Sequence, residues 1–406
     1  MKATVLQRVA RAAMLVLVAI MLFLFFSNDF GLVDIHKSSI VVAVGVDAEE
    51  DGYSVTAQAA VPTPAQGEGS AAYTRVTGKG ATVAEALDDI NAKTGFYPKL
   101  TFCNLVILGE SCKNYDLFTV LDYFYRNDYI PLTALVGMCG GSAKDLLGKQ
   151  PADGSMTSSA IQRAMSEELK NSANCSTVNL KLIAQSHGSA SEAAYMPYIS
   201  AEEGAEGGST TVASGGKGAK GGGEQKSGSA EFTCGQTAAF TGGRFAGILT
   251  REQAVALNLV QNVTRLAVIN AQYGGDNYTV GLKSVSCRAS VDAGGDVPAL
   301  KVRLRALANV QSADAAPSAE GSANTHLVKE EVLRAAEDII KERMASLVGF
   351  CRQNDCDLFY AKKLLYQHNY DKYVLFKEDL LSVMTEDFDI PVSYTHLRAH
   401  ETLSDG

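Results

Sequence analysis

An apolar segment near the amino terminus sets the strongest constraint on what this chain can become. Lys2, Arg8 and Arg11 are followed by an uncharged run from Ala12 to Phe26. The run is shorter than the roughly 20 residues of a comfortable membrane span and fits the apolar part of a secretion signal or a short anchor. Positive charge before the run keeps that end in the cytoplasm, so the rest of the chain is expected outside.

The residues after the run favour an uncleaved anchor over a cleaved signal peptide. The sequence from Phe25 to Asp29 offers no small residues at the spacing that cleavage requires. We therefore expect residues 1–30 to form a signal anchor, with a cleaved peptide as the alternative. A buried core helix is the weakest interpretation, because three cations precede the run and none lies inside it.

Composition limits the classes of function that remain. The chain has 406 residues, with 36 basic and 45 acidic side chains and a net charge of −9. This balance argues against a broad basic surface for nucleic acid or anionic lipid. Apolar residues make up 46% of the chain, which is enough for globular cores, and the length suggests two to three domains.

Strand and helix patterns alternate along the first half and predict an N-terminal α/β domain over residues 31–200. Ile40–Val46 is an apolar run of strand length, and Tyr53–Ala60 follows as its hairpin partner. Thr82 and Glu85 have the spacing of a capping box at the start of a helix.

Composition divides the second half into three parts. Residues 201–233 are rich in Gly and Ser and predict a flexible linker, because they bury too little apolar surface to offset the entropy of ordering. Residues 234–310 predict a middle α/β domain with a hairpin about Gly242-Gly243, and residues 325–391 predict a truncated C-terminal domain. The expected fold class is therefore α/β (α+β), with three mixed-sheet domains after the anchor.

A long helix is predicted to open the C-terminal domain, over Leu327–Val348. Glu337 and Lys341 are expected to pair on its exposed side, since residues four apart are neighbours on a helix. The opposite side carries an apolar stripe that is typical of a core-facing helix, formed by Val328, Val332, Ala336, Ile339, Met344 and Leu347.

No set of residues predicts catalysis, a cofactor or a metal. Asp47, Glu49, Glu50 and Asp51 are interpreted as a solvated hairpin turn, with a calcium site as the weaker alternative. The pair Cys351–Cys356 is a weak zinc signal, and Gly215–Gly223 lacks the strand and helix that a phosphate loop needs. Ser142, in a Gly-Gly-Ser sequence, is interpreted as a helix N-cap and not as a nucleophile. We expect a chain that binds partners and catalyses nothing.

An aromatic segment supplies the candidate contact residues. Tyr366, Tyr370, Tyr373 and Phe376 cluster in a short segment that follows the long helix and a second helix predicted over Asp355–Tyr366. Exposed tyrosines give contact area at low entropic cost, so this segment is a candidate partner contact. Packing of these side chains against the helix of their own domain is an equal alternative.

The C-terminal tail has the sequence of a sequencing-library adapter translated as codons. Val392–Thr402 reads VSYTHLRAHET, which matches such an adapter residue for residue. We interpret residues 392–406 as an adapter artefact without function. His396 and His400 are therefore not taken as metal ligands, although they have helical spacing.

Several segments together resemble the C-subunit family of spore germinant receptors, the Ger(x)C proteins. Val42–Asp47 (VAVGVD) with Gly52–Gln58 (GYSVTAQ) is similar to the family's opening hairpin. Lys99–Glu110 (KLTFCNLVILGE), Gly141–Leu147 and Asp357–Tyr373 are similar to later family motifs in the same order. The resemblance covers nearly everything from about residue 34 to residue 391.

The resemblance implies a non-catalytic extracytoplasmic subunit of a nutrient germinant receptor that triggers spore germination. It implies two integral-membrane partners, an A-type channel-like and a B-type transporter-like subunit, at the spore inner membrane. The chain departs from the family because residues 24–36 contain no lipobox Cys, so the peptide anchor must tether it. The alternative is an extracytoplasmic solute-binding protein of a transporter, which normally has two similar lobes.

Overall fold

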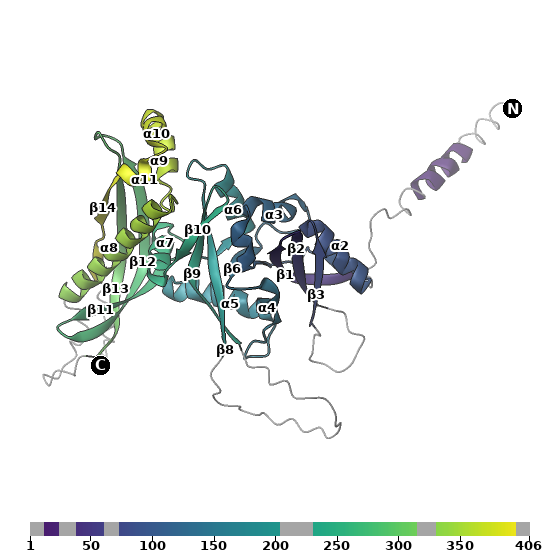
Figure 1. Ribbon diagram of the computed structural model, residues 1–406, viewed down its shortest axis with the longest axis horizontal. Coiled ribbons are helices and arrows are strands. Elements are labelled where there is room, and N and C mark those ends of the chain that lie inside the picture. Colours follow the sequence, from purple (N-terminus) through teal and green to yellow (C-terminus); the bar gives the residue numbers. More distant parts are fainter. Residues whose placement is uncertain (1–11, 24–37, 61–72, 204–229, 315–329, 395–406) are drawn as a thin grey trace, which may run out of the picture.

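The computed structural model describes residues 12–23, 38–60, 73–203, 230–314 and 330–394, which fold mainly around two mixed sheets (Figure 1). The first sheet has ten strands. Parallel strands β1, β5, β6 and β8 occupy its centre, and antiparallel strands extend it on both sides. Its strands are β1 (Ser38–Glu49), β2 (Gly52–Ala60), β3 (Tyr73–Gly80), β4 (Tyr97–Lys99), β5 (Leu105–Leu108), β6 (Leu135–Cys139), β7 (Val178–Asn179), β8 (Ala193–Glu203), β9 (Ala230–Thr241) and β10 (Arg244–Leu249).

Helices cover the first sheet, and the short central strands β5 and β6 consequently carry no polar side chains. All four residues of β5 are buried, as expected for a parallel strand with both faces covered. The elements between the strands are α2 (Val83–Thr94), the short 3₁₀ helix η2 (Glu110–Asn114), α3 (Leu117–Arg126), α4 (Ala143–Gly148), α5 (Thr157–Ser172) and α6 (Leu180–His187).

The second sheet has five strands in the order β11-β12-β13-β14, with β15 also paired to β13. The long helix α8 lies along it (Figure 1) and contacts β11 and β15. The remaining elements are α7 (Arg251–Val260), β11 (Leu266–Tyr273), β12 (Asp276–Asp292), β13 (Ala299–Ala313), α8 (Glu330–Gln353), α9 (Ala361–His368), α10 (Tyr370–Phe376), α11 (Leu380–Val383), β14 (Thr385–Asp389) and β15 (Val392–Tyr394).

The mixed α/β class is confirmed, but the sheets group the strands differently from the predicted domain boundaries. Strands β9 and β10, expected in a middle domain, complete the first sheet. Strands β11 to β13 instead join β14 and β15 of the C-terminal part. The Gly- and Ser-rich composition suggested a domain boundary here, but the strands on either side of it pair directly with each other, Glu203 with Ala230. The boundaries themselves stay a prediction.

Local sequence signals predicted a helix cap and a hairpin turn that the structure shows. Thr82 caps α2 by accepting a hydrogen bond from the backbone N–H of Glu85. The Glu85 carboxylate accepts from the backbone N–H of Ala81, one residue before the position that a capping box would use. Gly242 and Gly243 both have positive φ, 52° and 81°, as a two-residue hairpin turn between β9 and β10 requires.

The predicted long helix exists as α8. Of its predicted apolar stripe, Val332, Ala336, Met344 and Leu347 are buried, Ile339 is half-buried because Ile340 takes the core position, and Val328 lies outside the described residues. The pairing of Glu337 with Lys341 is wrong. The Glu337 carboxylate instead accepts a hydrogen bond of 2.8 Å from the backbone N–H of Val392, and the Lys341 ammonium lies 3.8 Å from Asp338. A buried strand end with an open N–H is a better partner for Glu337 than an exposed lysine.

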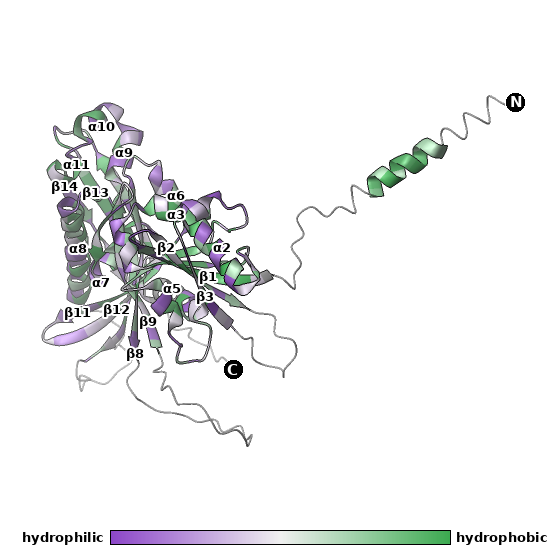
Figure 2. Ribbon diagram, turned by 45° about the vertical axis from the view of Figure 1, so that its right-hand side comes forward, coloured by the Kyte–Doolittle hydropathy of each residue, from purple (hydrophilic) through white to green (hydrophobic). Residues whose placement is uncertain are grey.

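The amino-terminal apolar segment is helical over residues 12–23, and its large apolar side chains are 42–73% exposed (Figure 2). Within the described ranges, no helix is both long enough and apolar enough to cross a membrane. Residues 1–11 and 24–30 of the predicted anchor lie outside those ranges. The anchor therefore stays a prediction.

The carboxyl end of the described chain is the short strand β15, which pairs in parallel with β13. Val392 is largely buried there, whereas residues 395–406, including His396 and His400, lie outside the described ranges. The interpretation of residues 392–406 as adapter sequence stays a prediction.

Replacing residues 204–229 with a two-residue Asn-Gly turn should leave the fold intact. Glu203 and Ala230 are already register partners, so a tight turn can join them. A shorter connection has a smaller entropic cost of closure, so the free energy of unfolding should rise. Because this cost changes slowly with loop length, the rise should be only about 1–2 kcal/mol. Urea unfolding of both proteins measures the difference. A large loss of stability in the shortened protein would show that the replaced segment packs on the fold.

Candidate partner-binding surface

The predicted aromatic segment lies on α9 and α10, at one end of the second sheet (Figure 1). Three tyrosine rings pack together there, with centroids 5.6 Å apart for Tyr366 and Tyr370, 5.2 Å for Tyr366 and Tyr373, and 6.1 Å for Tyr370 and Tyr373. The edge-on packing of the first two pairs is a favourable aromatic geometry. The tyrosines therefore form one cluster.

The four predicted residues divide between surface and interior. Tyr366 and Tyr370 are 51% and 59% exposed, whereas Tyr373 and Phe376 are half-buried against the core. Inward packing thus applies to Tyr373 and Phe376, while partner contact through the exposed Tyr366 and Tyr370 stays a prediction. The reason for the division is helical geometry, since α10 turns Tyr373 and Phe376 toward the sheet while Tyr370 faces away.

Two further exposed residues belong to the same surface and were missed. Val374 and Leu375 on α10 are 50% and 71% exposed. The sequence offered one signal for their exposure. They lie four and five residues after Tyr370, in a helix too short to bury side chains on more than one of its sides. We call Tyr366, Tyr370, Val374 and Leu375 the apolar crest.

Hydrogen bonds hold α10, which carries three of the four crest residues, against the second sheet. Asn369 caps α10 by accepting from the backbone N–H of Lys372 at 3.0 Å. The Lys372 ammonium donates to the carbonyls of Gly295 and Asp296 in the turn between β12 and β13, and it lies 5.9 Å from the Phe376 ring centroid. The helix carrying the crest is therefore tied to the second sheet.

A buried carboxylate fixes the start of α9. Asp357 is 1% exposed and accepts hydrogen bonds from the backbone N–H groups of Ala361 (2.8 Å) and Lys362 (2.7 Å) and from the Ser191 hydroxyl (2.6 Å). The Ser191 oxygen accepts in turn from the backbone N–H of Lys363 at 3.0 Å. Burial raises the pKa of Asp357 above its ordinary value of 3.8, and these hydrogen bonds offset the rise only in part.

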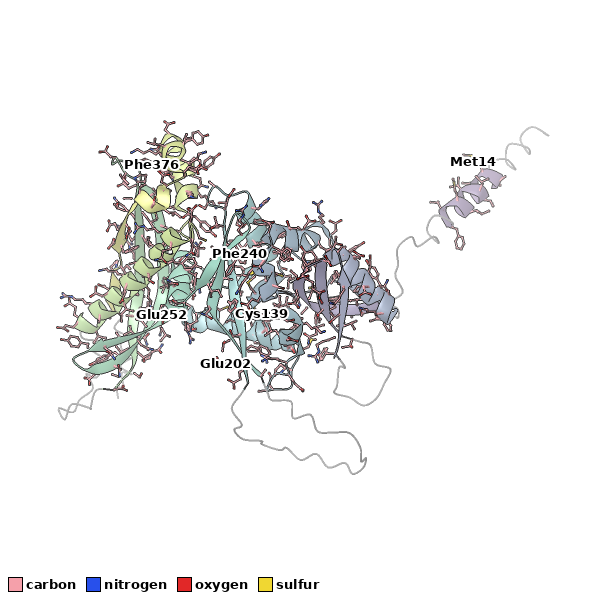
Figure 3. All side chains as sticks on the ribbon, in the orientation of Figure 1. Met14, Cys139, Glu202, Phe240, Glu252 and Phe376 are labelled. Atoms are coloured by element: carbon pink, nitrogen blue, oxygen red, sulfur yellow. The ribbon has the colours of Figure 1, made fainter. Side chains whose placement is uncertain are left out.

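The residues around Asp357 form a seam between the two sheets. The Thr241 hydroxyl donates to the Asp355 carbonyl at 3.1 Å, and the Gln261 amide donates to the Leu358 carbonyl at 2.6 Å. The Cys356 thiol donates to the carbonyl of Phe240, which lies in the middle of the molecule (Figure 3). The seam, residues 355–358 with their partners on β9, α7 and the Ser191 loop, joins the crest-bearing helices to the first sheet.

A cavity of about 240 Å³ opens beside the seam. Lys363 and Tyr360 border it from the start of α9, with the ammonium 5.6 Å from the ring centroid. The lining is otherwise mostly apolar, from α6, the start of β8 and the segment after α7: Val178, Leu182, Ile183, Ala193, Ala194, Tyr195 and Val263, with Gln185, Ser186, Ser189 and Gln261.

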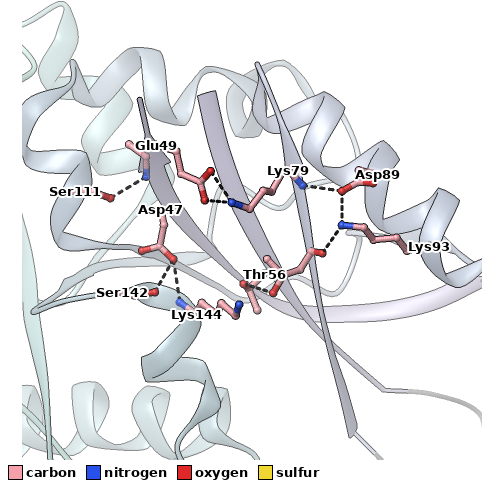
Figure 4. Close-up of polar contacts among 11 residues, drawn as sticks. Asp47, Glu49, Thr56, Lys79, Asp89, Lys93, Ser111, Ser142 and Lys144 are labelled. Atoms are coloured by element: carbon pink, nitrogen blue, oxygen red, sulfur yellow. Dashed lines mark hydrogen bonds and ion pairs between the residues drawn. The ribbon is translucent and has the colours of Figure 1, made fainter. Parts of the chain in front are cut away.

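The acidic cluster of the first hairpin is not a free ligand set (Figure 4). Asp47 lies inside β1 and accepts from the Ser142 hydroxyl (3.0 Å) and from the backbone N–H groups of Ala143 (2.8 Å) and Lys144 (3.1 Å). Glu49 pairs with Lys79 at 2.7 Å. Only residues 50 and 51 form the exposed turn, so the predicted turn is shorter than the acidic run. Ser142 is confirmed as the N-cap of α4.

The cysteines are small buried side chains with one exception. Seven are buried and Cys287 is half-buried, and none of these eight described residues forms a disulfide. Burial raises the pKa of the Cys356 thiol to about 12 and raises that of Cys351 as well, which disfavours the thiolate that zinc requires. Among the described residues, no cluster of His, Cys, Asp and Glu has the makeup of a metal site.

Comparison with known proteins places both halves of the chain among spore germination proteins. The family model for the spore germination protein N-terminal domain matches residues 32–201, and the model for the spore germination B3/GerAC-like C-terminal domain matches residues 235–394. A solved structure described as "Crystal Structure of the GerBC protein" has a TM-score of 0.48 and 13% identity, covering 86% of this chain and 96% of that chain. None of the curated proteins matches the chain significantly.

The Asp357→Ala substitution should destabilise the protein by about 3 kcal/mol, because two buried N–H groups and the Ser191 hydroxyl lose their acceptor. Asp357→Asn should cost less, since an asparagine can still cap the helix. Urea unfolding of the full chain in detergent gives the values.

The matched control is Asp355→Asn, two residues away. Asp355 is exposed and pairs with Lys362 at 3.3 Å, and asparagine tolerates its positive φ of 44°. Its loss should cost about 1 kcal/mol or less. Equal effects at both positions would contradict the role assigned to the buried carboxylate.

Proposed function

The chain belongs to the GerAC-like spore germination protein family, and from that premise we propose that it is a non-catalytic extracytoplasmic subunit of a nutrient germinant receptor. In this proposal it holds partner subunits together and contributes to triggering germination. The partners are two integral-membrane subunits, one A-type and channel-like and one B-type and transporter-like. Family membership supports a role in a germinant receptor. The identity of the two partner subunits is part of this proposal.

The use of the buried polar groups supports a binding role. Asp357 and Asp47 are the carboxylates with the most hydrogen bonds to backbone N–H groups, and both are occupied in capping helices. A general acid or base needs a free position for the proton that it moves. These two carboxylates are instead committed to holding the fold.

The observation that carries the proposal is the apolar crest. Exposed apolar side chains gathered on a rigid element mark interaction sites on soluble domains. The crest offers two tyrosines and two aliphatic residues on α9 and α10, which the seam and the β12–β13 turn hold in place. A preorganised surface of this kind binds a partner with little loss of conformational entropy.

We further propose that residues 1–30 anchor the chain in the spore inner membrane, with the rest on the extracytoplasmic side. The uncharged run from Ala12 to Phe26 and the cations before it support this topology. Residues 24–36 contain no cysteine for lipidation, so the peptide itself serves as the tether.

Substituting Tyr366→Ala together with Tyr370→Ala should reduce co-purification of the two polytopic subunits from spore membranes. The loss should be at least about tenfold, since truncating an interface hot spot costs about 2 kcal/mol. Immunoblotting of the captured complex provides the measurement.

Tyr273→Ala is the control for that experiment, because Tyr273 is also an exposed tyrosine (37%) and lies on the distant β11–β12 hairpin. Circular dichroism should be unchanged for all three proteins. Full recovery of the partners with the crest variant would move the interface elsewhere. Spores that lack the protein yet respond normally to nutrients would refute the receptor role.

Deleting residues 1–30 should release the protein from the membrane fraction into the soluble fraction. The full chain should stay in the membrane fraction and incorporate no radiolabelled fatty acid. Recovery of the wild-type protein in soluble, N-terminally cleaved form would establish a signal peptide in place of an anchor.

A further inference from the structure

A second apolar surface lies at the edge of the first sheet where its parallel strands begin. Strands β1, β5 and β6 run in parallel, so their amino ends share one edge. Strand β4 pairs with the very start of β1, Ser38 with Tyr97. The connections that lead into β4, β5 and β6 therefore meet at this edge, although they are far apart in sequence.

Each connection presents large apolar side chains to solvent. Phe96 and Tyr97, which lead into β4, are 36% and 47% exposed, and Phe102, which leads into β5, is 56% exposed. Tyr129 and Leu132, which lead into β6, are 73% and 46% exposed. We call these five residues the amino edge.

Buried neighbours hold these side chains outward. Phe102 lies between Leu100 and Cys103, which are both buried, and the backbone N–H of Cys103 donates to the Leu100 carbonyl at 2.9 Å. The neighbouring residues occupy the core positions, so Phe102 cannot turn inward without displacing them. Its exposure is a fixed feature of the loop.

The connection into β6 is fixed in the same way. The backbone N–H of Tyr129 donates to the Asn127 side chain at 3.0 Å, and Ile130 behind it is buried. The Leu132 carbonyl accepts from the backbone N–H of Lys181, which ties this connection to the start of α6. The amino edge is thus a shaped surface and not a set of loose loops.

The charges around the amino edge suit a phospholipid surface. Lys99 on β4 and Lys181 on α6 form no ion pair with any described residue, although the whole chain carries a charge of −9. Two exposed carboxylates also lie near this edge: Asp128 is next to Tyr129, and Asp88 is close to Tyr123, which is itself close to Tyr97. Aromatic rings favour the headgroup level of a bilayer, and lysines extend toward the phosphates there.

The path of the chain identifies the occupant. The apolar helix of residues 12–23 precedes β1, and β1 begins at Ser38, beside Tyr97 at the amino edge. An anchored helix that precedes β1 therefore brings this edge of the sheet near the membrane surface. We propose that the amino edge rests on the phospholipid bilayer, with its rings at headgroup level. This inference rests on the anchor of the proposed function.

Because the chain contains no Trp, a single introduced Trp reports on one position alone. Tyr129→Trp and Phe102→Trp place reporters on the amino edge, and Tyr273→Trp places one on the distant hairpin. Each full-length protein is reconstituted into phosphatidylcholine–phosphatidylglycerol vesicles with acyl-brominated phosphatidylcholine. Emission at positions 129 and 102 should fall roughly twofold, because interfacial rings lie within reach of the brominated chains. Emission at position 273 should not change.

Flotation of the same vesicles separates the two hypotheses. If the proteins float and no reporter is quenched, the anchor stands and the amino-edge proposal is wrong. Equal quenching of all three reporters also overturns it, because contact is then not specific to this edge. If the proteins do not float, the anchor fails and the inference fails with it. A position-129 spectrum that shifts only after addition of the polytopic subunits assigns the edge to a protein partner instead.

Discussion

The antiparallel ladder between β8 and β9 is the interaction on which the rest of the molecule depends. It pairs Ala193–Glu203 with Ala230–Thr241 and so adds the first strands of the second half to the sheet of the first half. The chain then passes from β10 through α7 into the second sheet. The ladder therefore fixes where the second sheet begins, and the two matched family regions share one sheet.

If backbone pairing were the only connection, the second sheet would be attached to the first through a single strand. The seam supplies further contacts between the two sheets. Removing the Asp357 carboxylate from water is unfavourable unless hydrogen bonds replace its hydration. Two come from α9 and one from Ser191, which lies just before β8. One side chain thus satisfies a helix terminus and also links segments 166 residues apart. Burying this carboxylate is unfavourable by itself. Because it therefore needs these particular hydrogen-bond partners, it makes the contact between the two parts of the chain specific.

Features that depend on neighbouring residues could be predicted from the sequence, and features that depend on distant ones could not. The caps at Thr82 and Ser142 and the Gly242-Gly243 turn are local, because side chain and backbone partner lie within a few residues. Asp47 could not be understood this way, since its partners on α4 are more than 90 residues away. The sequence showed that the tyrosines cluster, but it did not predict α10, and only the packing of this helix decided which of them face solvent.

The two apolar surfaces lie at opposite ends of the described fold, and this separation gives them different consequences. The amino edge adjoins the start of β1, while the crest is at the far end of the second sheet (Figure 1). The ladder and the seam hold the distance between them constant. A bilayer beneath the amino edge would therefore hold the crest at a set place beyond the membrane surface. Any partner that binds the crest must then extend out of the bilayer to reach it. The position of the crest therefore constrains the shape of the partner as well.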